Sequence, residues 1–144
     1  MILVIVSSVI FLDQLSKFIV VRFLQLNTPV SLIKNFLYMT LVYNRGAAFG
    51  MLKNQLFFFV LISFFVILFI FLHLKNKKIP LLYKISLSLI LAGSVGNLID
   101  RLRFGYVIDF LDLRFWPVFN LADSALTIGA LLLSWEILFS KNVT

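Results

Sequence analysis

Acidic side chains are few in this chain, and two of them are placed where they could do chemistry. The 144-residue sequence has six Asp and Glu residues, and neither Asp109 nor Asp123 has a Lys or Arg three or four positions away. A helical ion pair therefore does not account for either carboxylate. Two carboxyl groups held together in a poorly solvated pocket do not both ionise easily, so one keeps its proton. An acid and a base then lie side by side, as hydrolysis of a peptide bond requires, and we take this pair as the candidate catalytic residues.

Further polar residues recur at helical spacing. Three sets each share one helix face: Asp13 with Lys17, Asn97 with Asp100 and Arg101, and Asn120 with Asp123. We expect these faces to converge, with Asp109 supplied by a loop. For Asp13, Lys17 and Arg101 two interpretations stay open: contacts that hold helices together, or a direct part in function.

The elements that must position these residues are membrane-spanning helices. The chain is 62% hydrophobic and only 13% charged, which is typical of a protein whose solvent is the bilayer. Apolar stretches predict spans at about residues 2–23, 56–74, 80–99 and 119–139 in one domain of residues 1–144. Charges at Asp13 and Lys17 argue against a cleaved signal peptide in the first stretch. The predicted fold class is membrane α, a bundle of four transmembrane helices.

The distribution of lysines predicts how the bundle is oriented. Lys75, Lys77 and Lys78 lie between the second and third spans, and short basic loops stay in the cytoplasm. Both termini are then cytoplasmic. We attribute the net charge of +7 to this topology and expect no nucleic-acid partner.

The segments between the other spans then lie outside the cytoplasm. The β-favouring composition of residues 30–43 predicts a small extracytoplasmic sheet between helices 1 and 2. Between helices 3 and 4 we expect a short loop or helix. Asp112 is interpreted as a solvated loop acid and Glu136 as a surface residue at the cytoplasmic end.

Other kinds of active site fit less well. The chain has no cysteine and one histidine, so we expect no thiolate nucleophile, no metal site and no cofactor. A serine–histidine pair would need Ser94 to meet His73, which lies about 20 Å away in membrane depth. The main alternative is a small transporter or proton-conducting protein, but its carboxylates should form a path across the membrane. A non-enzymatic scaffold is the third interpretation.

Five short motifs carry a family resemblance. They are Asp13-Gln14-Leu15-Ser16-Lys17, Tyr43-Asn44-Arg45-Gly46-Ala47-Ala48-Phe49-Gly50, Gly96-Asn97-Leu98-Ile99-Asp100-Arg101, Val107-Ile108-Asp109-Phe110 and Phe119-Asn120-Leu121-Ala122-Asp123-Ser124. Together, and over all four spans, the chain resembles the bacterial lipoprotein signal peptidase family, also called signal peptidase II or prolipoprotein signal peptidase.

The resemblance implies an activity and a set of site residues. The family is an aspartic endopeptidase that removes the signal peptide from diacylglyceryl-modified prolipoproteins, cleaving before the lipidated lipobox cysteine. By resemblance Asp109 and Asp123 are catalytic. The supporting residues would be Asp13, Lys17, Asn44, Gly46, Asn97, Asp100, Arg101 and Asn120.

The resemblance also implies a location and partners. The protein would lie in the bacterial cytoplasmic (inner) membrane with its active site near the outer leaflet, in contact with membrane lipids. Cyclic-peptide inhibitors of the globomycin type would bind it. The segment from Asn44 to Gly50 would form a cradle over the substrate, although Gly46 and Gly50 can equally be turn residues.

Overall fold

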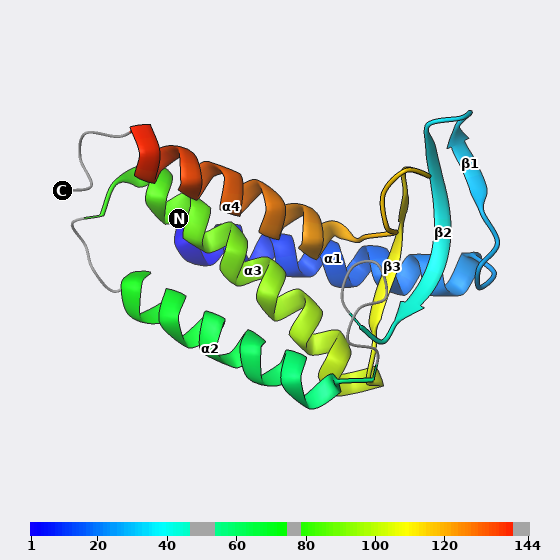
Figure 1. Ribbon diagram of the computed structural model, residues 1–144, viewed down its shortest axis with the longest axis horizontal. Helices are drawn as coiled ribbons and strands as arrows, with labels where there is room; N and C mark the ends of the chain where they lie inside the picture. Colours follow the sequence, from blue (N-terminus) through cyan, green and yellow to red (C-terminus); the bar gives the residue numbers. More distant parts are fainter. Residues whose placement is uncertain (47–53, 75–78, 140–144) are drawn as a thin grey trace.

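Four apolar helices make up most of the structure, a computed structural model that describes residues 1–46, 54–74 and 79–139. Their bounds are α1 (Ile2–Phe23), α2 (Leu56–Leu74), α3 (Leu81–Phe104) and α4 (Leu121–Phe139). Each is long and apolar enough to cross a membrane. The predicted bundle of four apolar helices is confirmed, and the chain is a multi-pass membrane protein (Figure 1).

Helix α3 packs against each of the other three helices. It packs closely against α4 because the glycines at this contact have no side chain. A Cβ atom on Gly93 would collide with the carbonyl oxygen of Ala122, and one on Gly129 would lie 2.8 Å from the carbonyl oxygen of Ser86. Small residues at such contacts let helix backbones approach each other in a membrane. The helix continues beyond its predicted end to Phe104 and ends at Gly105, whose φ of 77° suits glycine.

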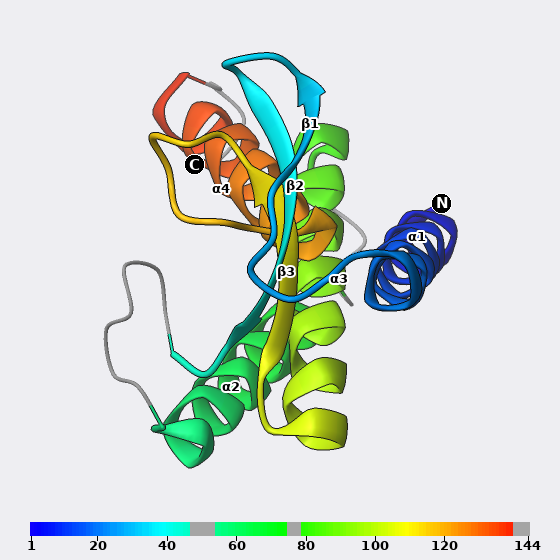
Figure 2. The same ribbon diagram turned by 90° about the vertical axis from the view of Figure 1, so that its right-hand side faces the viewer.

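A three-stranded antiparallel sheet lies at one end of the bundle. Its strands are β1 (Val30–Ile33), β2 (Leu37–Asn44) and β3 (Val107–Asp112), in the order β1-β2-β3. Figure 2 shows the strands crossing the end of the bundle, with α1 to one side of α3. The sheet predicted between α1 and α2 is therefore present, with a third strand added from elsewhere in the chain.

The third strand corrects a prediction. We expected a loop or short helix between α3 and α4, yet a six-residue strand there pairs with β2, and Asp109 lies on this strand. Val107, Ile108 and Phe110 favour extended backbone. The deciding interaction is the pairing with β2, more than 60 residues earlier in the chain, which local patterns do not reveal.

A small hydrophobic core attaches the sheet to the helices. Val20 of α1 packs with Leu41 of β2 and with Ile108 and Phe110 of β3, and all four side chains are buried. The position of β3 relative to α1 is therefore set by burial of apolar surface.

Two acidic residues differ from their predicted surroundings. Asp112 is buried, accepting a hydrogen bond from the Thr40 hydroxyl at 2.7 Å and one from the Arg114 backbone N–H at 2.8 Å. It is therefore not a solvated loop acid. Glu136 is also buried, contrary to the predicted surface position. It follows Gly129 by seven residues, which puts it on the face of α4 that packs into the bundle.

Candidate active site

A buried ion cluster joins α1 to α3. The Lys17 ammonium lies 2.8 Å from a carboxylate oxygen of Asp13 and 2.8 Å from one of Asp100, and all three side chains are almost fully buried. Gln14 donates to the other oxygen of Asp100 at 2.9 Å. Buried charges need such pairing because isolated ones are costly in a low dielectric. The predicted contact between Asp13 and Lys17 is confirmed.

The same carboxylates hold two other elements in place. Asp13 accepts a hydrogen bond at 2.9 Å from the backbone N–H of Ala122, one of the unpaired donors in the first turn of α4. Asp100 accepts one at 3.1 Å from the backbone N–H of Ile108 on β3. The cluster therefore connects α1 and α3 to the start of α4 and to the strand that carries Asp109.

Asp123 is oriented by the way α4 begins. Asn120 precedes the helix, and its side-chain oxygen accepts a hydrogen bond from the backbone N–H of Asp123 at 2.8 Å. In return, a carboxylate oxygen of Asp123 accepts one from the backbone N–H of Asn120 at 3.3 Å. This reciprocal pair is a capping box, with Asn at the cap and Asp three residues on. The other oxygen of Asp123 accepts a hydrogen bond from the Asn97 amide at 2.7 Å.

Asp109 is held by two asparagine side chains. The Asn120 amide donates to one carboxylate oxygen at 2.7 Å, and the Asn44 amide donates to the other at 2.9 Å. Asn44 is itself oriented, because its side-chain oxygen accepts the backbone N–H of Gly46 at 2.9 Å. Asn120 thus contacts both aspartates and is completely buried.

Burial changes the protonation of Asp109. Loss of solvent around this side chain, together with the nearby negative charge of Asp123, raises the pKa of Asp109 to about 7. The hydrogen bonds from Asn44 and Asn120 oppose this rise because they stabilise the ionised form. Near neutral pH this carboxyl group can therefore carry or release a proton.

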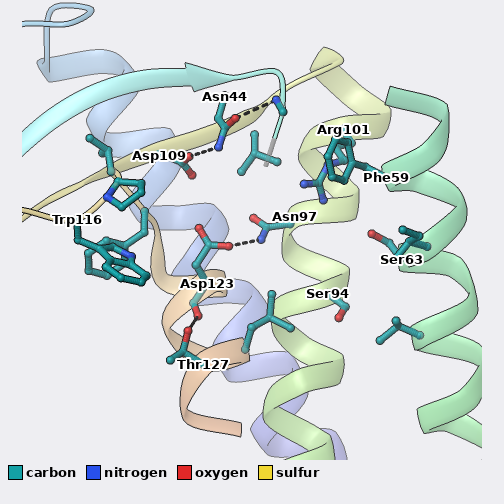
Figure 3. A pocket seen from close by; sticks show the side chains of 18 residues that line it. Asn44, Phe59, Ser63, Ser94, Asn97, Arg101, Asp109, Trp116, Asp123 and Thr127 are labelled. Carbon is teal, nitrogen blue, oxygen red and sulfur yellow. Dashed lines mark hydrogen bonds between the residues drawn. The ribbon is translucent and has the colours of Figure 1, made fainter. Parts of the chain in front are cut away.

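Both aspartates open into one pocket of about 480 Å³. Figure 3 shows the side chains of Asp109 and Asp123 directed toward the same space, from β3 and α4. Arg101 lines the pocket as well, with its guanidinium 5.0 Å from the centre of the Phe59 ring. Toward the middle of the bundle the walls are mostly apolar and come from α2 and α4: Phe59, Ile62, Val66 and Leu126.

Comparisons with known proteins identify the family of the chain. The family described as signal peptidase (SPase) II matches residues 5–139. The chain belongs to the signal peptidase II family. It is 44% identical to the lipoprotein signal peptidase of Caldanaerobacter subterraneus subsp. tengcongensis, over 99% of each chain. It is 48% identical to that of Moorella thermoacetica, over 90% of this chain and 87% of the relative.

A solved structure has the same fold. A bacterial membrane enzyme 31% identical to this chain superposes with a TM-score of 0.89, over 99% of this chain and 93% of the other. The protein described here is therefore a membrane peptidase of the signal peptidase II family.

The structure brings together most residues singled out in this signal peptidase II sequence. Hydrogen bonds or ion pairs connect these members of the predicted set around the pocket: Asp13, Lys17, Asn44, Gly46, Asn97, Asp100, Asp109, Asn120 and Asp123. Arg101 lines the same pocket, where its guanidinium lies near the Phe59 ring and its charge interacts with Asp123 and Asp109. Residues 47–50 of the predicted cradle lie outside the described part of the chain.

Gln14 is a site residue that sequence reasoning did not single out. Its amide contacts Asp13 and Asp100 as well as the backbone carbonyl of Gly96. A signal was available, because a polar side chain directly after Asp13 in an apolar helix must find a hydrogen-bonding partner.

The structure gives no support to the two alternatives, a serine–histidine active site and a transporter. Ser94 lines the pocket, but His73 is the penultimate residue of α2, which runs from the sheet end of the bundle to the opposite end (Figure 1). For a transporter, the next acidic residue along α4 after Asp123 is Glu136, thirteen residues away. That separation is about 20 Å along the helix, too far for a direct proton relay.

Removing the central cation should destabilise the protein strongly. Lys17→Met leaves Asp13 and Asp100 facing each other without their shared counter-charge, and breaking a buried pair in this way costs about 3–5 kcal/mol. Thermal unfolding of the purified variant in detergent measures the loss. Lys34→Met removes an exposed lysine and should change the free energy of unfolding by less than about 0.5 kcal/mol. Equal stability of the two variants would contradict a structural role for the cluster.

Proposed function

We propose that this protein is an intramembrane aspartic endopeptidase that removes the signal peptide from diacylglyceryl-modified prolipoproteins, cleaving before the lipidated cysteine. The proposal depends on one observation: Asp109 and Asp123 open into a single pocket and are joined by the side chain of Asn120. The names of the relatives, lipoprotein signal peptidases, support the substrate class.

In the proposed mechanism the two aspartates share one proton. The ionised carboxylate accepts a proton from a water molecule. At the same time the oxygen of that water bonds to the carbonyl carbon of the scissile peptide. The protonated carboxyl donates its proton to the carbonyl oxygen, which gives a neutral tetrahedral intermediate. When the C–N bond breaks, the carboxyl group that took the proton from water donates it to the leaving nitrogen, and the other carboxylate takes a proton from a hydroxyl of the intermediate as the new carboxylic acid forms. A pKa of about 7 for Asp109 supports this exchange near neutral pH.

The neighbouring residues would preorganise this pair. Asn44 and Asn97 each donate to one aspartate, so both carboxylates keep their orientation without substrate. Arg101 would stabilise negative charge that develops on the substrate, since its guanidinium lines the same pocket. Asp13, Lys17 and Asp100 would act through position, by holding α4 and β3.

The shape of the pocket supports a membrane-bound substrate. Its apolar walls from α2 and α4 continue from the aspartates toward the middle of the bundle, where an apolar signal peptide or acyl chains would lie. Orientation follows from the lysines between α2 and α3: both termini would be cytoplasmic, in the bacterial inner membrane, with the aspartates near the outer leaflet. Cyclic peptides of the globomycin type would compete for the same pocket.

Omitting the lipid from the substrate tests the assignment. A peptide with a diacylglyceryl cysteine should be cleaved before that cysteine, and the same peptide with a free thiol should be cleaved at least about 100-fold more slowly. The reason is that the acyl chains supply binding energy and hold the scissile bond at the membrane surface. Cleavage products are measured by mass spectrometry with purified protein. Equal rates for the two peptides would exclude the lipoprotein assignment.

The pH dependence of cleavage tests the shared proton. Above the pKa of about 7, Asp109 loses its proton and both carboxylates are charged. No acid then remains, so kcat/KM should fall about tenfold for each further pH unit. The profile is measured on the lipidated peptide, with pre-incubated samples returned to neutral pH as a control for unfolding. A rate that stays constant two pH units above neutrality would contradict the mechanism.

A further inference from the structure

A second pocket lies between α1 and α3 and shares no lining residue with the pocket of the aspartates. Its volume is about 210 Å³. Phe18 and Val21 of α1 and Ile108 of β3 provide apolar walls. Tyr43 and Tyr106 also line it, and their rings stack with centres 4.5 Å apart. One part of this pocket is therefore suited to hydrocarbon.

The other part of the pocket is positively charged. Arg22 and Arg103 line this part, and both residues are exposed. Neither guanidinium has a carboxylate partner among the described residues. The acidic residue in the lining, Asp100, is already paired with Lys17 at 2.8 Å. Each guanidinium lies over a phenylalanine ring, Arg22 at 4.2 Å from the centre of Phe18 and Arg103 at 5.0 Å from the centre of Phe104. Neither charge is neutralised by these contacts, so both can pair with an anion from outside the chain, and guanidinium groups bind phosphate in a bidentate manner.

The position of the arginines indicates where that anion comes from. Arg22 lies in the last turn of α1 and Arg103 in the last turn of α3. Both helices end on the side of the sheet (Figure 1). At a rise of about 1.5 Å per residue each helix is more than about 30 Å long, so its last turn reaches the level of the lipid headgroups. A charged rim at this level above apolar walls matches an amphipathic lipid.

We propose that this pocket binds an anionic phospholipid of the leaflet on the sheet side, with its phosphate between Arg22 and Arg103. An acyl chain lies against Phe18 and Val21. The bound lipid also touches Ile108, whose backbone N–H is held by Asp100. Occupancy therefore stabilises the contact between β3 and the helices.

Lipid-dependent thermal stability of the full chain tests this site. The protein is purified in a neutral detergent and unfolded thermally with added phosphatidylglycerol or with phosphatidylcholine of the same acyl chains. A ligand that binds only the folded state raises Tm by mass action, and we expect phosphatidylglycerol to raise Tm by about 5 °C more than phosphatidylcholine. Soluble glycerol phosphate should give no shift, because it has no acyl chain to bury.

Matched variants locate the effect. Arg22→Gln/Arg103→Gln should lose the difference between the two lipids, whereas Arg22→Lys/Arg103→Lys should keep part of it because the charges remain. Lys34→Gln/Arg114→Gln removes the same number of positive charges from the sheet side without touching the pocket and should respond like the wild type. An unchanged response of the first variant, or equal stabilisation by phosphatidylcholine or glycerol phosphate, would overturn the proposal. The measurement needs no peptidase activity, so its outcome is independent of the proposed function.

Discussion

Replacing either Asp109 or Asp123 by asparagine should abolish peptide cleavage, with a loss in kcat of at least about 10⁴-fold. An amide can neither take a proton from water nor give one to the leaving amine. Because the two side chains act as one unit, the double variant should be no slower than either single variant. Rates are measured with a diacylglyceryl-modified peptide and purified protein.

Folding must be separated from chemistry in this experiment. Both oxygens of Asp109 accept hydrogen bonds from amide groups, those of Asn44 and Asn120. In Asp109→Asn the new NH2 group therefore faces one of these donors and loses a hydrogen bond. We expect a cost of about 1–3 kcal/mol in stability. Asp112→Asn is the matched control, because Asp112 is also buried on β3 and accepts hydrogen bonds, from Thr40 and Arg114, but does not line the pocket. It should remain active, and substantial cleavage by either Asp109→Asn or Asp123→Asn would eliminate the proposed pair.

Asn120→Ser should separate the two roles of Asn120. Serine caps a helix about as well as asparagine, so α4 should begin at the same place. The amide that donates to Asp109 at 2.7 Å is lost. A hydrogen bond to a charged group contributes about 1.5–3 kcal/mol, so kcat/KM should fall between about 10-fold and 100-fold. The same amide also donates to the side-chain oxygen of Asn97 and to the carbonyl oxygen of Ile108, so the free energy of unfolding should fall by about 1–3 kcal/mol. Asn120→Ala also lacks the cap and should lose about 1 kcal/mol more stability with the same loss of activity.

The pH profile of Asn120→Ser gives an independent measurement. The hydrogen bond from Asn120 stabilises the ionised form of Asp109 and so lowers the pKa of Asp109. Without it that pKa rises, and the decline in activity on the alkaline side should move to higher pH than in the wild type. A profile that does not move, together with full activity, would show that Asn120 serves only as a helix cap.

Much of the fold could be predicted from local sequence because the bilayer imposes strong constraints on it. An apolar stretch of about 20 residues has few alternatives to a spanning helix. Helical spacing then puts Asp13 and Lys17 on one face and groups Asn120 with Asp123. These relations join residues that are close in the sequence, so the spacing of residue types is enough to predict them.

The contacts that make the site depend on pairings between distant segments. The pairing of β3 with β2 put Asp109 on a strand beside Asn44, where a loop had been predicted. The same pairing buries Asp112, which local patterns indicated as solvated.

Spacing along the chain determined which side chains share a helix face, and composition determined that those faces lie in a membrane. Only the tertiary structure decided that Asn120 contacts both aspartates, and that Asp13 binds the first turn of α4 across 109 residues of sequence. The physical reason is that a hydrogen bond between distant segments forms only after the packing of apolar surfaces has brought their backbones together. No local pattern of residues records that event.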